Sequence, residues 1–300
     1  MEVLATWLEP LNLGPESLFL LAMAPFFLGF IAWEAWYWRN TPAAYSLRDT
    51  LNNAFLAASY QLADGIAWAA VIGLFYWLYQ FRLFEIPLTW WSLLSLFIAQ
   101  DFLYYWFHRA SHRIRWLWAS HVVHHSSERS NLSTAFRQSM TYPISGMWAF
   151  WLPLALIGFH PKHVVLVVAI NLAYQFFIHT EVVRRLGPLE LVLNTPSHHR
   201  VHHGRNPEYI DRNFGGVLIV WDKLFGTFTP EDQANPPEYG IQRQIHTNNV
   251  LTMIFHEWRD MLRDAARPGP LWLRLKHLWA PPEWQRPQHE STALASHAQR

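Results

Sequence analysis

Apolar residues are concentrated in five runs that end near residue 178. The three longest cover residues 17–38, 55–81 and 86–107, and each is long enough to cross about 30 Å of hydrocarbon as a helix. Two shorter runs, at 144–159 and 163–178, are joined by a predicted tight turn. The pattern predicts an all-α integral membrane protein with four to five transmembrane helices. The last two runs form either full crossings or a short re-entrant hairpin.

The remainder of the chain is more polar, and no run after residue 181 is long enough to span a membrane. Residues 248–267 have the pattern of an amphipathic helix. Residues 271–279 are rich in Trp, Leu and basic residues, which is typical of a helix lying along a membrane surface. Residues 281–300 form a polar, Pro-rich tail.

The amino-acid composition supports the membrane interpretation and excludes cysteine-based chemistry. Charged residues make up 15% of the chain, whereas a soluble domain averages about 25%. The net charge of +1 gives no reason to expect a nucleic-acid partner. There is no cysteine, which excludes disulfides, thiolate metal sites and cysteine nucleophiles. The chain is instead rich in histidine, with 17 residues.

The distribution of basic residues predicts the orientation in the membrane. Of the 23 Lys and Arg residues, two lie in 39–50, five in 108–140 and fourteen in 181–300, which leaves only Arg82 and Lys162. Because basic residues favour the cytosolic side, an exterior N-terminus with five crossings places every Arg-rich segment in the cytosol. A histidine-rich helical cap and the C-terminus are therefore expected on the cytosolic face.

Histidines gather in four places that this topology puts on one side of the membrane. The first has the spacing His-x3-His, the second and fourth share the spacing His-x2-His-His, and the third is a single histidine ending the fifth run. On a helix, positions i, i+3 and i+4 lie within about a 100° arc, so the three imidazoles of such a motif can converge on one point. The candidate metal ligands are His108, His112, His121, His124, His125, His179, His199, His202 and His203.

Eight or more imidazoles exceed the three or four ligands of one zinc site, which favours two metal ions in a shared cavity. Imidazole suits zinc, copper, iron and nickel, so the ligand type does not identify the metal. The absence of HExxH weighs against a zinc protease. Two rivals to an enzyme are a membrane metal-binding or transport protein and a b-type haem carrier. Both need histidines within the spans, whereas most of these lie beyond the span ends.

Several polar residues beside the histidines are candidates for supporting them. Asp101 precedes His108 by seven residues and can accept the second ring N–H of a ligating histidine. Its alternative role is a membrane-surface pair with Arg109 or Arg113. The other candidates, for holding ligands, binding a polar head group or pterin, or forming a structural hydrogen-bond network, are His198, Glu128, Asn131 and Arg137. Trp221 and Asp222 are expected to be structural.

Four stretches around these residues resemble the fatty acid hydroxylase/sterol desaturase superfamily of membrane non-haem iron enzymes. They are DFLYYWFHRASH (101–112), LWASHVVHHSSERSNLSTAFRQS (117–139), NTPSHHRVHHGRN (194–206) and NFGGVLIVWDKLFGTF (213–228). The last three are most similar to the branch that includes alkylglycerol monooxygenase. The resemblance implies one membrane domain over residues 1–300 with a catalytic core at about 93–228.

The resemblance also implies the cofactor and the reaction. The family's ligand positions map onto His108, His112, His121, His124, His125, His199, His202 and His203. His179 stands where relatives carry further histidines, and Gln175 stands where some carry one more. Two iron ions, which zinc can replace, would activate O2 to oxidise an unactivated C–H bond of a bilayer lipid. Electrons or tetrahydropterin would come from a separate partner.

The implied reaction has two versions, and we favour monooxygenation over desaturation because residues 126–139 follow the second cluster as in the ether-lipid branch. An alternative within the family is a desaturase or hydroxylase acting on a sterol or carotenoid.

Overall fold

The computed structural model describes residues 15–41 and 44–287, so most of the expected polar tail lies outside the described residues. The described residues form α and 3-10 helices joined by loops and turns. Their only β pairing consists of two isolated bridges, Leu193 with Leu218 and Gly204 with Tyr239. The all-α fold class is therefore confirmed for this part of the chain.

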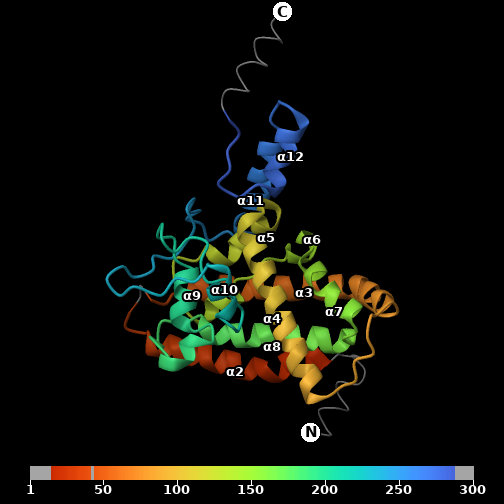
Figure 1. Ribbon diagram of the computed structural model, residues 1–300. Helices are drawn as coiled ribbons and strands as arrows, with labels where there is room; N and C mark the ends of the chain where they lie inside the picture. Colours follow the sequence, from red (N-terminus) through yellow and green to blue (C-terminus); the bar gives the residue numbers. More distant parts are fainter. Residues whose placement is uncertain (1–14, 42–43, 288–300) are drawn as a thin grey trace, which may run out of the picture.

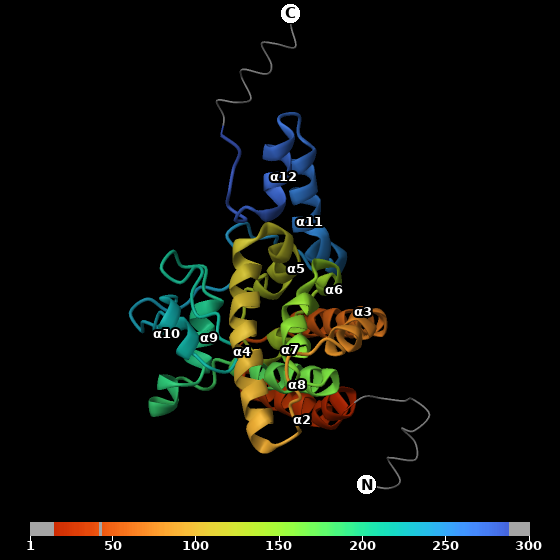
Figure 2. The same ribbon diagram turned by 45° about the vertical axis from the view of Figure 1, so that its right-hand side comes forward.

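Three helices in the described part are long and apolar enough to cross a membrane: α2 (Pro15–Tyr37), α3 (Leu47–Tyr79) and α8 (Pro161–Ile178). Figures 1 and 2 show them running in a similar direction, with α8 beside α2. Much of the apolar surface of α2 and α3 faces outward, as for Phe26 on α2 and Ile66 on α3, whereas α8 is more than half buried. Such surfaces suit a hydrocarbon environment, which supports an integral membrane protein.

The helix expected over 86–107 forms as α4 (Trp90–Arg113), but it is shifted toward the C-terminus. It starts at Trp90 because Thr89 and Ser92 form a reciprocal capping box. In both views α4 runs across the direction of α2, α3 and α8 (Figures 1 and 2). Its polar second half carries His108 and His112, and α4 is not among the three membrane-crossing candidates.

The run expected over 144–159 is not one helix. It is divided into α6 (Tyr142–Ser145), the 3-10 helix η3 (Met147–Trp151) and α7 (Leu152–Ile157). Gly146 ends α6 with a φ of 83°, and Pro153 in the first turn of α7 has no N–H to continue a helix from η3. The apolar composition of this run concealed these two breaks.

The remaining helices surround the candidate site or extend from it. The bounds are α5 (Arg115–His125), η2 (Leu132–Phe136), η4 (Gly187–Leu191), α9 (Pro196–His202), α10 (Val220–Phe225), α11 (Val250–Ala266) and α12 (Leu271–Trp279). The helices predicted at 248–267 and 271–279 are confirmed as α11 and α12. These two form a hairpin that packs on α5 and projects from the helical body (Figures 1 and 2).

Candidate metal centre

The nine candidate histidines converge in two groups of buried side chains. In each group the potential ligand atoms all lie within 4.8 Å of one another. The five-histidine group consists of His108, His112, His121, His125 and His202. The four-histidine group consists of His124, His179, His199 and His203. The groups are adjacent, because the rings of His125 and His203 stack with centroids 4.4 Å apart.

Each His-x2-His-His motif supplies both groups. On α5, His121 and His125 join the five-histidine group while His124 joins the other. At the end of α9 the assignment is reversed. His199 and His203 join the four-histidine group, and His202 joins the five-histidine group. Positions i and i+4 differ by about 40° around a helix, whereas i+3 and i+4 differ by about 100°. Although three imidazoles of one motif can converge on one point, neither motif does so here: each divides its histidines between the two groups.

Backbone carbonyl groups fix the proton position on four of the nine rings. Nδ1 lies 2.9, 3.3, 2.6 and 2.9 Å from a carbonyl oxygen in the pairs His108–Phe214, His124–Arg137, His179–Gln175 and His202–Arg212, respectively. A carbonyl oxygen only accepts hydrogen bonds, so in a neutral ring the proton is on Nδ1. Each of these rings therefore directs an unprotonated Nε2 into its group.

The inward-facing nitrogens lie very close together. His124 Nε2 and His179 Nε2 are 3.1 Å apart although both carry lone pairs, which repel unless a cation lies between them. Across both groups, the neighbouring Nε2 atoms are 2.8 to 3.1 Å apart. Two imidazoles bound at right angles, with a metal–nitrogen distance of about 2.1 Å, would have nitrogens about 3.0 Å apart. The histidines thus fit metal ions by donor type and spacing.

Burial lowers the pKa of eight of these nine imidazoles and so favours their neutral form. Desolvation lowers the pKa of His179 to about 4. Burial together with neighbouring imidazoles lowers the pKa of His125 and His203 well below the usual value. A neutral imidazole is the form that binds a metal ion, so the site binds without first losing protons near neutral pH.

Two residues that the sequence analysis missed hold ligand rings by their side chains. The hydroxyl of Tyr142, at the start of α6, lies 2.5 Å from Nδ1 of His121. Asp211 lies 3.4 Å from Nδ1 of His112 and also pairs with Arg113 at 3.0 Å. Neither residue lies in a histidine motif, so only its position in the fold reveals the contact.

Asp101 does not contact a histidine, nor does it pair with Arg109 or Arg113, so both interpretations of its role are wrong. Its buried carboxylate accepts four hydrogen bonds, from Asn171 Nδ2 (2.8 Å), Val217 N (2.8 Å), Leu218 N (3.1 Å) and Trp221 Nε1 (2.9 Å). Asp101, on α4, thus connects the segment 213–228 to α4 and, through Asn171, to α8. That segment provides the Phe214 carbonyl group that faces His108.

A glycine and a second carboxylate complete this connection. A Cβ atom on Gly216 would lie 2.9 Å from Asp101 Oδ1 and 2.8 Å from Asn171 Oδ1, so only glycine permits this approach. Asp222 accepts from the backbone N–H groups of Phe214 and Gly215, both at 2.7 Å. Trp221 and Asp222 thus have the structural contacts expected of them.

Arg137 combines two of its predicted roles. Its carbonyl group faces His124, and its buried guanidinium donates to Val123 O at 3.1 Å and to Asp49 Oδ1 at 3.1 Å. The network therefore joins the end of α5 to the start of α3. Asn131 caps η2 by accepting from Ser133 N, which is a structural role.

Three other candidates lie outside the two groups. Glu128 is exposed and pairs with His246 at 3.2 Å. His198 is buried against the ring of Phe228, with centroids 5.3 Å apart, and belongs to neither group. Gln175 accepts from Tyr104 Oη at 2.8 Å, and its backbone carbonyl group faces His179.

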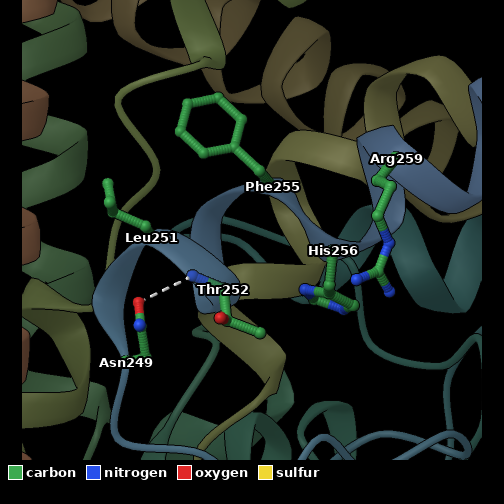
Figure 3. Close-up of a pocket in the computed structure, with 6 residues that line it drawn as sticks. All are labelled: Asn249, Leu251, Thr252, Phe255, His256 and Arg259. Carbon is green, nitrogen blue, oxygen red and sulfur yellow. Dashed lines mark hydrogen bonds between the residues drawn. The ribbon is translucent and has the colours of Figure 1, made fainter.

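A pocket on α11 is separate from the histidine groups (Figure 3). Its lining residues are Asn249, Leu251, Thr252, Phe255, His256 and Arg259. None of the nine candidate ligands is among them. Nδ1 of His256 lies 3.0 Å from the carbonyl oxygen of Met253, so this histidine has a local structural contact.

The fold and site define a class: helical membrane proteins with buried, histidine-only metal centres. The family model described as Fatty acid hydroxylase matches residues 93–227. This match identifies a fatty acid hydroxylase domain over residues 93–227, and the relatives below confirm the similarity to the alkylglycerol monooxygenase-like branch of that superfamily. No solved structure matches the chain.

Three curated relatives illustrate the similarity. Alkylglycerol monooxygenase of Danio rerio is 39% identical over 267 residues, covering 87% of this chain and 58% of that protein. Alkylglycerol monooxygenase of Homo sapiens is 52% identical over 181 residues, covering 59% of this chain and 39% of that protein. Ornithine lipid hydroxylase OlsE of Rhizobium tropici is 30% identical over 159 residues, covering 53% and 48%. The chain spans about half the length of these relatives.

Proposed function

We propose that the protein is a membrane-bound, O2-dependent lipid monooxygenase that holds two iron ions, one in each histidine group. The observation that carries this proposal is the convergence of nine buried imidazoles in two adjacent groups within a fatty acid hydroxylase domain. Iron bound there would supply the O2 activation that attack on an unactivated C–H bond requires. The match to a fatty acid hydroxylase domain favours this enzyme over a metal-storage or metal-transport protein.

The chain's own residues prepare the site in two ways. Backbone carbonyl groups orient the rings and fix their proton positions, and the side chains of Tyr142 and Asp211 orient His121 and His112. Burial of the histidines excludes bulk water, which protects a reactive site from side reactions. The lipid would reach this site from the bilayer, and a separate reductase or tetrahydropterin would supply the electrons.

For the substrate we propose an alkylglycerol-type ether lipid, because relatives with this activity in their names show the strongest similarity given above. Hydroxylation of the carbon beside the ether oxygen gives a hemiacetal. The hemiacetal divides into a fatty aldehyde, which keeps the inserted oxygen, and a glycerol product.

The reaction is tested with isotopically labelled O2, purified membranes, an alkylglycerol and a reductant. The aldehyde should carry the label, provided that it is reduced to the alcohol as it forms, before it exchanges with water. An alkene with all label in water would instead show a desaturase. A hydroxylated sterol or carotenoid, with no reaction of the alkylglycerol, would show that the substrate class is wrong.

Metal binding is tested independently of the substrate. His203→Ala removes one ligand from the four-histidine group and should abolish activity and lower the iron content. The matched control is His246→Ala, because His246 is exposed and lies outside both groups. Membrane insertion should be unchanged in both. Equal iron content and activity in the two variants would contradict the proposed ligand set.

We further propose that the histidine groups face the cytosol, as the distribution of basic residues predicts. Because the chain has no native cysteine, single cysteines at exposed positions report the topology. Cysteine at Glu128 and at Glu208 should react with an impermeant reagent from the cytosolic side, and cysteine at Lys162 from the other. Reaction of positions 128 and 162 from the same side would overturn this orientation.

A further inference from the structure

Helix α12 has an apolar face that no other described element covers. At about 100° per residue, the positions 271, 272, 275 and 279 fall within one arc of about 100°. All four are large apolar residues, and they are 64, 55, 42 and 52% exposed: Leu271, Trp272, Leu275 and Trp279. The opposite side, with Leu273 and His277, is buried against the rest of the hairpin.

Basic residues border this face on both sides, and α12 contains no acidic residue. Arg274 lies at one edge and Lys276 at the other. The Lys276 ammonium lies 4.9 Å from the ring centroid of Trp284 and 6.0 Å from that of Trp272. A Trp- and Leu-rich face with cationic edges matches the interfacial region of an anionic bilayer, where aromatic rings lie at head-group level and basic side chains reach the phosphates.

The direction of α12 agrees with this environment. In both views α12 runs across the direction of α2, α3 and α8 (Figures 1 and 2). Those three helices are the membrane-crossing candidates. A helix that lies crosswise to spanning helices runs along the membrane plane, which is the orientation of an interfacial helix.

We propose that the exposed face of α12 lies in the head-group region of the membrane that contains α2, α3 and α8, with Arg274 and Lys276 on anionic lipid phosphates. This contact is connected to the metal centre through Arg115, the first residue of α5. Arg115 N donates to Ala280 O at 3.1 Å, and its guanidinium pairs with Glu257 at 2.6 Å and Asp264 at 2.8 Å on α11. The hairpin therefore acts as a second membrane anchor for the helix that carries three candidate ligands.

The test uses the full chain reconstituted in phosphatidylcholine vesicles with and without phosphatidylglycerol. A fluorophore on Leu275→Cys should be quenched by lipids that carry a nitroxide at the head group, to an extent comparable with a fluorophore on Trp36→Cys, an exposed position at the end of α2. A fluorophore on the exposed loop position Gln285→Cys should be quenched far less. Quenching at position 36 without quenching at position 275 would overturn the proposal.

Charge reversal separates the lipid surface from other occupants. Arg274→Glu with Lys276→Glu should reduce quenching at position 275 when phosphatidylglycerol is present and change it less in phosphatidylcholine alone. Disulfide formation between two Leu275→Cys chains, with no lipid quenching, would show that a second copy covers the face and that the proposal is wrong.

Discussion

At the scale of single residues, the role of each candidate ligand depends on what its outward-facing ring nitrogen meets. For four histidines this partner is a backbone carbonyl group, which a side-chain substitution leaves in place. His121 differs because its Nδ1 faces the hydroxyl of Tyr142. That partner can be removed by deleting one oxygen atom, so it offers a direct test of how a ring is oriented.

Tyr142→Phe should lower metal affinity or activity by about 10- to 100-fold, because His121 loses the partner that fixes its ring orientation. The measurement is iron content and turnover of the purified protein. The matched control is Tyr174→Phe, which removes a hydroxyl that donates to Asn194 O at 2.6 Å and contacts no candidate ligand. Equal effects of the two substitutions would mean that the His121 contact has no special role.

At the scale of elements, α4 positions the site through both its histidines and its buried carboxylate. One face carries His108 and His112, and one turn of the same helix carries the buried Asp101. That carboxylate holds segment 213–228, from which the Phe214 carbonyl group reaches back to His108. Segment 213–228 therefore orients the candidate ligand His108 without supplying a ligand itself. The orientation of His108 depends on the hydrogen bonds that join this segment to Asp101.

Asp101→Asn should destabilise the fold by on the order of 3 kcal/mol, because an amide cannot satisfy four donors as a carboxylate does. Activity should fall further than iron content, since eight of the nine candidate ligands keep their own contacts. Thermal unfolding and metal analysis measure the two effects. Asp232→Asn, at an exposed carboxylate, should leave both unchanged. An Asp101→Asn protein with unaltered thermal stability would contradict the assigned role.

At the scale of the whole molecule, the fold brings nine imidazoles from four segments into a buried space. This arrangement has a pH dependence with a definite sign. Burial lowers the pKa of His179 from 6.5 to about 4, so below pH 6.5 the unfolded chain binds protons that the folded chain does not. The stabilising contribution is complete above pH 6.5 and is lost progressively as the pH falls toward about 4.

Acidification across that interval should therefore lower the thermal unfolding temperature and release bound iron. Unfolding curves and metal analysis at a series of pH values measure both effects. Lowering the pH should affect wild-type protein more than His203→Ala, which has one buried imidazole fewer. An unfolding temperature that stays constant from pH 6.5 down to 4 would contradict the assignment of neutral, buried rings.

The sequence by itself determined the helical membrane class, the helices α11 and α12, and the nine candidate histidines. These features depend on the periodicity of apolar residues and on the spacing of histidines, and both can be recognised in the sequence without knowledge of the fold. The breaks at Gly146 and Pro153 were also present in the sequence, but the apolar composition of their run hid them.

Only the tertiary structure decided how the histidines are divided and what holds them. The division of each motif between two groups depends on which helix faces which. The partners of His108, His124, His179 and His202 are backbone carbonyl groups, which every residue has and no side-chain pattern marks. Asp101 was correctly singled out as an ionisable residue in an apolar run. Its partners lie 70 to 120 residues away in the chain, and only folding brings them together.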